Sequence, residues 1–186
     1  KDEYIHSGLV ELDKLIKKKY SIDGFYEAAM NLYNAGEIIE IIHHVFVNMK
    51  IPINNKVIRF LLNAYYSHIP NIQLLPDAKW LLENIKEGVN LGIISDGLLD
   101  AQYNKVKALR LPEKFHSIIL SDRFGRENWK PSNLPYQHLC MALQVQHKEC
   151  VYVSNCIEKD FITAKKLGWK TVYVKRPDSH IIVDFT

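Results

Sequence analysis

Polar residues stand at three points of the chain where apolar runs end. Ser95-Asp96-Gly97 follows one run, Lys130 lies in the next polar stretch, and Asn155 and Asp160 follow the run Val151–Val153. A phosphoryl group is bound by a hydrogen-bond donor and a positive charge, which a serine hydroxyl and a lysine supply. An amide oxygen and a carboxylate are hard ligands that suit Mg²⁺. These residue types predict phosphoryl chemistry beside a magnesium ion.

The elements that must position these residues alternate between strand and helix. From residue 75 onward, the pattern predicts strands at 90–95, 117–121, 149–154 and 171–174, and helices at 76–87, 100–109, 132–143 and 159–167. This spacing predicts right-handed crossovers and a parallel sheet. Because the carboxyl ends of parallel strands meet at one edge, we expect the hydroxyl, the lysine and the Asn/Asp pair to converge there.

Each of these residues also has a plainer interpretation when it is taken alone. Ser95-Asp96-Gly97 is typical of a tight turn, and so is Ser154-Asn155. Lys130 suits a solvated loop, and Asp160 suits the first turn of a helix, where an acid is favoured. Their order along the chain is what favours a common site.

The first 70 residues show no strand pattern. Apolar residues recur at helical spacing over 4–20, over 25–49 with a break near Asn34-Ala35-Gly36, and over 54–66. Ser21 and Asp23 are candidate caps for the helix that begins near Phe25. We therefore predict a helical subdomain over residues 1–70 and an α/β domain over residues 71–186.

Composition narrows the classes of protein and partner. The 186 residues carry a net charge of +3, which is too small a bias to indicate nucleic acid or a membrane surface. No apolar run is long enough for a transmembrane helix. The cysteines (Cys140, Cys150 and Cys156) form no Cys-x-x-Cys pair, so we expect reduced thiols in a cytoplasmic protein rather than disulfides or a zinc site.

Three spaced segments resemble a known family. Ile93–Gly97, Lys130-Pro131 and Val151–Asp160 resemble motifs two, three and four of the haloacid dehalogenase-like (HAD) superfamily. Outside these segments, Gln102 and Ala164–Trp169 also match the pattern of the family. The resemblance covers roughly residues 75–175, and the preceding helices resemble the cap that follows the family's first motif.

The resemblance implies a fold and a reaction. The fold would be α/β, with a Rossmann-like parallel sheet, helices on both faces and an all-helical cap. The reaction would be Mg²⁺-dependent hydrolysis of a small phosphorylated metabolite through an aspartyl-phosphate, with a second aspartate as acid and base. No nucleic acid or membrane partner is implied, and a homodimer stays open as the assembly.

The resemblance also implies residue roles. Ser95 would donate to a phosphoryl oxygen, and Asp96 and Gly97 would complete the phosphate-binding loop. Lys130 would offset charge on the nucleophile and on the transferring group. Asn155 and Asp160 would take the metal-side positions.

Two departures from the family pattern bear on activity. The first motif, Asp-x-Asp on a strand, does not occur before the cap, so we expect a piece that carries it upstream of Lys1. A permuted role for Asp184, which follows an apolar run, is the alternative, and an ordinary tail is the plainer interpretation of that run. Asn155 stands where the family has aspartate, and its uncharged oxygen should hold Mg²⁺ more weakly.

Two rival functions stay open; the departures favour the first of them, whereas the second would also need the upstream aspartate and explains a Mg²⁺-type acidic loop less well. One is a non-catalytic HAD-like domain that binds a phospho-ligand or a protein, and the other is a dehalogenase on the same fold. Substrate choice would fall to cap aromatics, for which Tyr65, Tyr66 and His68, or Phe25 and Tyr26, are candidates. For each of them, a place in the core of the helical bundle is the plainer interpretation.

Overall fold

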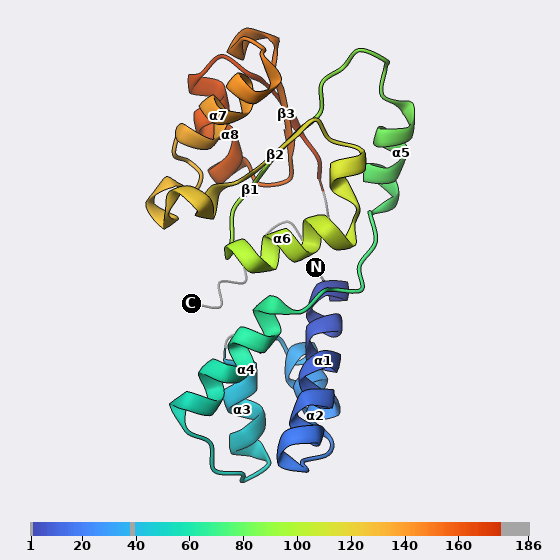
Figure 1. Ribbon diagram of the computed structural model, residues 1–186, viewed down its shortest axis with the longest axis vertical. Coiled ribbons are helices and arrows are strands. Elements are labelled where there is room, and N and C mark those ends of the chain that lie inside the picture. The colour runs from blue at the N-terminus through green and yellow to red at the C-terminus, as the bar shows by residue number, and fades with distance from the viewer. Residues whose placement is uncertain (1, 38–39, 176–186) are drawn as a thin grey trace. The chain divides into compact units, whose positions relative to one another are not determined.

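The structure is a computed structural model, and it describes residues 2–37 and 40–175 (Figure 1). Two compact units divide the chain, with the boundary between Gln73 and Leu74. The Asp184 hypothesis lies outside the described residues. Among those residues, no helix combines the length and the apolar character needed to cross a membrane.

The first unit consists of helices. They are α1 (Asp2–Tyr20), α2 (Phe25–Asn34), α3 (Ile41–Asn48) and α4 (Asn55–Ser67). One apolar core joins all four helices, and Leu12, Phe25, Val45 and Leu61 are fully buried in it. Tyr65 belongs to the same core, so Phe25 and Tyr65 are core residues, as their plainer interpretation has it.

The start of α2 differs from the prediction. Neither Ser21 nor Asp23 caps this helix; the N-cap is Gly24, which has a left-handed φ of 82° and makes no side-chain cap hydrogen bond. The Tyr26 N–H instead donates to Oδ1 of Asp13 in α1, at 3.0 Å. The prediction was wrong because the amide is satisfied by a residue of the neighbouring helix, which local sequence does not reveal.

The second unit alternates helices and strands. Its elements are α5 (Pro76–Asn84), β1 (Gly92–Ser95), α6 (Leu99–Ala108), β2 (Ser117–Leu120), α7 (Leu134–Leu143), β3 (Val151–Ser154), α8 (Ile157–Lys166) and β4 (Lys170–Tyr173). Short 3₁₀ turns cover Leu111–Glu113, Ser121–Phe124, Arg126–Asn128 and His147–Glu149. The predicted α/β class with parallel strands is confirmed.

The described strands form two separate parallel pairs. β1 runs parallel to β2, with Ile94 opposite Ile119, and β3 runs parallel to β4, with Val153 opposite Val172. Within the described residues, no ladder joins β1 to β3. α7 packs on β1 and β2, while α8 packs on β3 and β4.

One core nevertheless serves both pairs of strands. Tyr136 of α7 is fully buried, and its ring lies 5.6 Å from that of Tyr152 in β3. Ile94 of β1 and Trp169, just before β4, belong to the same cluster. At Gly92, an added Cβ would lie 2.7 Å from Leu139 Cδ1, so the missing side chain lets α7 approach β1 closely.

Candidate active site

A buried ion pair lies between β1 and β3, near the carboxyl ends of these strands. Lys130 Nζ is 2.9 Å from Oδ1 of Asp160, and the two side chains are 10% and 11% exposed. Burial of two opposite charges is costly unless their remaining hydrogen-bonding positions are also satisfied. The stability of this ion pair therefore depends on the groups that surround it.

The ammonium group of Lys130 has three acceptors. Besides Asp160, it donates to the Ile94 carbonyl and to the Tyr152 hydroxyl oxygen, each at 3.4 Å. An ammonium carries three donors, so this set matches its capacity. Burial, with help from Asp160 and Asp96, raises the pKa of Tyr152 above its usual range, so this hydroxyl stays protonated. Ile94 lies on β1 and Tyr152 on β3, so Lys130 links the two pairs of strands.

Asp96 joins three loops: its own loop after β1 (the first loop), the stretch that contains Lys130 (the second loop) and the stretch that follows β3 (the third loop). Its carboxylate accepts the Lys130 backbone N–H, at 3.1 Å to Oδ2 and 3.3 Å to Oδ1. Lys159, beside the third loop, places its Nζ 3.1 Å from the same Oδ2. A carboxylate held in this way fixes the loops, while phosphate contacts at residues 96 and 97 would come from backbone N–H groups.

The first loop is built around Gln102. The Ser95 hydroxyl donates to Gln102 Oε1 at 3.0 Å. Gly97 has a φ of 122°, and a Cβ there would lie 2.5 Å from Gln102 Nε2. A hydroxyl has one proton, so Ser95 can donate to a phosphoryl oxygen when it releases Gln102.

The third loop orients Asp160. Its Oδ2 accepts the Ser154 hydroxyl, and Ser154 Oγ in turn accepts the Cys156 N–H at 3.0 Å. The Tyr136 hydroxyl donates to the Asp160 carbonyl at 2.8 Å. Asn155 lies half-buried in the same loop. The structure thus brings Lys130 and Asp160 into contact and ties Asp96 to both neighbouring loops, while Ser95 is turned to Gln102.

Three further residues shape this edge, and no role was predicted for them from the sequence. Lys159 holds Asp96, and Tyr152 holds Lys130. The Trp129 indole N–H donates to Oδ1 of Asp122 at 3.1 Å, and Lys159 Nζ lies 5.6 Å from the Trp129 ring centroid. Tyr152 and Lys159 lie within the segment Val151–Asp160, which resembles a family motif. Their partners lie in other loops, so no local sequence pattern predicted these contacts.

The oxygen atoms at this edge suit a magnesium ion in kind. Asp160 offers a carboxylate and Asn155 an amide oxygen, and Mg²⁺ takes one or two carboxylates together with water and substrate oxygens. Both carboxylate oxygens of Asp160 already accept a hydrogen bond or an ion pair, but each oxygen keeps a second lone pair. Asn155 and Asp160 thus have the ligand atoms for part of the coordination shell of a Mg²⁺ ion.

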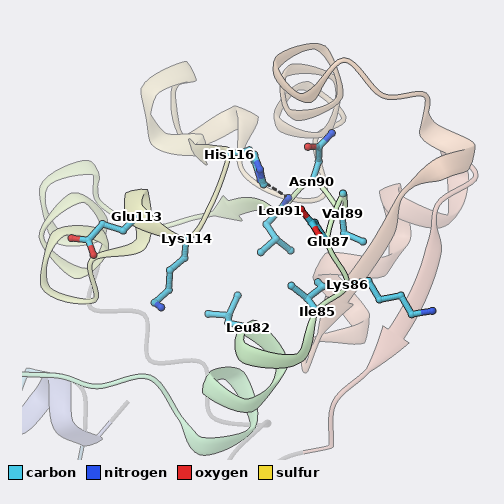
Figure 2. Close-up of a pocket in the computed structure, with 11 residues that line it drawn as sticks. Leu82, Ile85, Lys86, Glu87, Val89, Asn90, Leu91, Glu113, Lys114 and His116 are labelled. Atoms are coloured by element: carbon cyan, nitrogen blue, oxygen red, sulfur yellow. Dashed lines mark hydrogen bonds between the residues drawn. The ribbon is translucent and has the colours of Figure 1, made fainter.

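A pocket of about 410 Å³ lies at the opposite end of β1 (Figure 2). It is lined by the end of α5, by residues 85–91 and by Glu113, Lys114 and His116. The Leu91 N–H donates to His116 Nδ1 at 3.0 Å and closes one wall. This pocket faces the amino ends of the strands, so it is separate from the Lys130–Asp160 edge.

Comparison with known proteins identifies the family. A model of haloacid dehalogenase-like hydrolases matches residues 14–174. The chain belongs to this family. Curated relatives of this HAD chain include the glyceraldehyde 3-phosphate phosphatase of Pyrococcus abyssi, which is 30% identical over 129 residues, 68% of this chain and 53% of the relative.

A second relative is the N-acylneuraminate-9-phosphatase of Mus musculus, 26% identical over 111 residues, 59% of this chain and 44% of the relative. The HAD chain thus spans about half the length of the curated relatives it matches.

Solved structures agree on the fold. The HAD phosphatase of Thermococcus onnurineus has a TM-score of 0.53 at 21% identity and covers 95% of this chain and 81% of its own. The HAD-hydrolase YfnB of Bacillus subtilis, solved with bound magnesium, has a TM-score of 0.59 at 13% identity and covers 91% and 80%. At these identities the likeness shows the HAD-like fold.

Proposed function

We propose that this HAD family member hydrolyses a small phosphomonoester through an aspartyl-phosphate, with Mg²⁺ at the site. The observation that carries the proposal is the Lys130 ammonium held against Asp160 where β1 and β3 end. Each of the three N–H donors of Lys130 has an acceptor, so the ammonium group is held in a fixed position. Stabilisation of charge on a transferring phosphoryl group requires such a position. The relatives named phosphatases support a phosphorylated metabolite as substrate.

The residues of the edge would divide the work. Lys130 would stabilise negative charge on the phosphoryl group, and Ser95 would donate to one of its oxygens. Backbone N–H groups of the Asp96-Gly97 turn would bind another. Asn155 and Asp160 would hold Mg²⁺, which when bound would supply further positive charge beside the phosphate.

We propose that the nucleophile lies on a strand between β1 and β3. The Lys130 ammonium touches one residue of each, Ile94 and Tyr152, so it stands between the two pairs of strands. A parallel strand that carries Asp-x-Asp would satisfy the facing edges of β1 and β3 and place its aspartates beside Lys130. The helices up to residue 73 would then serve as the cap.

A binding domain without catalysis is the second candidate. Asn155 in place of an aspartate favours it, and so does the engagement of both Asp160 carboxylate oxygens by Lys130 and Ser154. Such a domain would keep phosphate affinity and lose turnover.

The test is hydrolysis of a panel of small phosphomonoesters with Mg²⁺, with Lys130→Met compared against Lys148→Met. Loss of one preorganised charge contact typically lowers kcat by about 10²–10³-fold, whereas Lys148 is exposed in a turn outside the site and its replacement should leave kcat unchanged. Circular dichroism checks that both variants fold. Phosphate binding without turnover in the unaltered protein would favour the binding domain instead.

A further inference from the structure

A cluster of metal-ligating side chains lies in the helical unit, around the start of α3. The carboxylate of Glu40 and the imidazoles of His43 and His44 have ligand atoms that all lie within 4.8 Å of one another. Among the residues that the structure describes, this is the one such group of three. The proposed phosphatase reaction uses none of these residues.

The backbone places Glu40 at this cluster at a cost. Its φ of 54° is left-handed, a conformation that a residue with a side chain rarely adopts. Glu40 is the N-cap of α3, yet its side chain makes no capping hydrogen bond. Its Oε2 lies instead 3.9 Å from His43 Nδ1, too far for a hydrogen bond and near enough for both atoms to reach one ion.

A second carboxylate orients His44. Glu37 Oε2 lies 3.0 Å from His44 Nδ1. A carboxylate only accepts hydrogen bonds, so Nδ1 of His44 is the nitrogen that carries a proton, which leaves Nε2 as the ligand atom of the neutral imidazole. Histidines that bind zinc are oriented by a carboxylate in this manner.

We propose that Glu40, His43 and His44 bind a zinc-class divalent ion, with Glu37 as the residue that positions His44. Two imidazole nitrogens and one carboxylate oxygen are a ligand set that Zn²⁺ accepts, with water in the fourth position. Mg²⁺ prefers oxygen ligands alone, so this site is chemically distinct from the Asn155–Asp160 edge. The histidine side chains are 45% and 43% exposed, which leaves room for the ion and its water.

Calorimetric titration of Zn²⁺ into the full chain, in excess Mg²⁺, tests the site. We expect one tight equivalent, at least about 10-fold weaker in His43→Ala or His44→Ala and absent when both are replaced. Alanine is a better helix former than histidine, so α3 should persist in these variants. His6→Ala is the matched control, because His6 is an exposed histidine of the same unit that contacts Tyr26 rather than the cluster.

Two further measurements separate this site from other destinations of the ion. Glu37→Gln keeps all three ligands and removes the positioning charge, so it should weaken Zn²⁺ binding about 10-fold. Co²⁺ bound to Glu40, His43 and His44 gives visible d–d bands without sulfur charge-transfer absorption. Thiolate absorption from Cys140 and Cys150, whose sulfurs lie 3.6 Å apart, would overturn the proposal. Unchanged Zn²⁺ affinity after replacement of both histidines would overturn it as well.

Discussion

The ammonium group of Lys159 lies 3.1 Å from Oδ2 of Asp96, a carboxylate that is only 7% exposed. Through this contact the start of α8 holds the turn after β1, while the same carboxylate accepts the Lys130 N–H. Three loops that are far apart in the sequence therefore meet on one side chain. The geometry of the candidate active site depends on Asp96 as a fixed anchor.

Replacement of Lys159 by methionine should loosen this anchor. Lys159 is 37% exposed, but Asp96 is 7% exposed and would lose its charged partner, so the free energy of unfolding should fall by about 1–3 kcal/mol. We expect kcat/KM for a phosphomonoester to fall about 10-fold, because small displacements of catalytic groups are expensive. Lys166→Met, at an exposed position of the same helix, is the control and should behave as the unaltered protein. Equal rates for both variants would contradict the anchoring role.

Asp160→Asn should be strongly destabilising. The change leaves the Lys130 ammonium buried without its charged partner, which typically costs about 3–5 kcal/mol. Urea denaturation measures the free energy of unfolding. Glu158→Gln alters an exposed residue in the same first turn of α8, and its expected change is within about 0.5 kcal/mol. A loss below 1 kcal/mol in Asp160→Asn would show that the pair contributes little.

Two glycines with positive φ should respond differently to alanine. Gly168 has a φ of 82° and no atom within 4 Å of an added Cβ, so Gly168→Ala should cost only backbone strain, about 1 kcal/mol. Gly97 has a φ of 122°, and its added Cβ would collide with Gln102. The amide of Gln102 ends a flexible side chain and can move aside, so Gly97→Ala should cost mainly backbone strain, about 1–3 kcal/mol, and should lower phosphatase activity through Ser95, which donates to Gln102. Thermal unfolding and kcat/KM distinguish the two outcomes.

Lys105 should make stability depend on pH. Burial lowers the pKa of this lysine to about 8, from an ordinary 10.5. Between about pH 8 and pH 10.5 the unfolded chain therefore binds more protons at Lys105 than the folded chain does. The free energy of unfolding should rise over this pH range as the proton is lost. Lys105→Met should therefore stabilise the protein at pH 7, by on the order of 1–3 kcal/mol.

The advantage of Lys105→Met should shrink as the pH rises above about 8 and disappear only well above pH 10.5, where the lysine is neutral in both the folded and the unfolded state. Lys107→Met, at an exposed position of the same helix, should show no such trend. Parallel urea curves for the two variants at pH 7 and pH 10 make the comparison. A constant difference between the Lys105 variant and the parent at both pH values would contradict a buried, weakly basic amine.

Periodicity and motifs predicted much of this architecture, and long-range contacts account for what they missed. The apolar run at Gly92–Ser95 indicated a strand because burial on a sheet leaves a local pattern, and the run Val151–Ser154 forms a strand as well, although Val151 and Val153 are about half exposed. The cap of α2 was missed because Asp13, which accepts the Tyr26 N–H, belongs to another helix. Lys159 carries no local sign that it holds Asp96, since that contact exists only once the loops have met. Residue type indicated the chemistry of the site, whereas the folded chain decides which groups touch.

The buried ring of Tyr136 has a consequence for how the α/β unit opens. It lies in a cluster shared by β1 and β3, and its hydroxyl is bonded to the backbone at Asp160. Neither pair of strands can leave this cluster without exposing a large aromatic surface of the other. The backbone amides of β1 and β3 should therefore exchange with solvent deuterium through one common, cooperative event, although no ladder joins them in the described part of the chain.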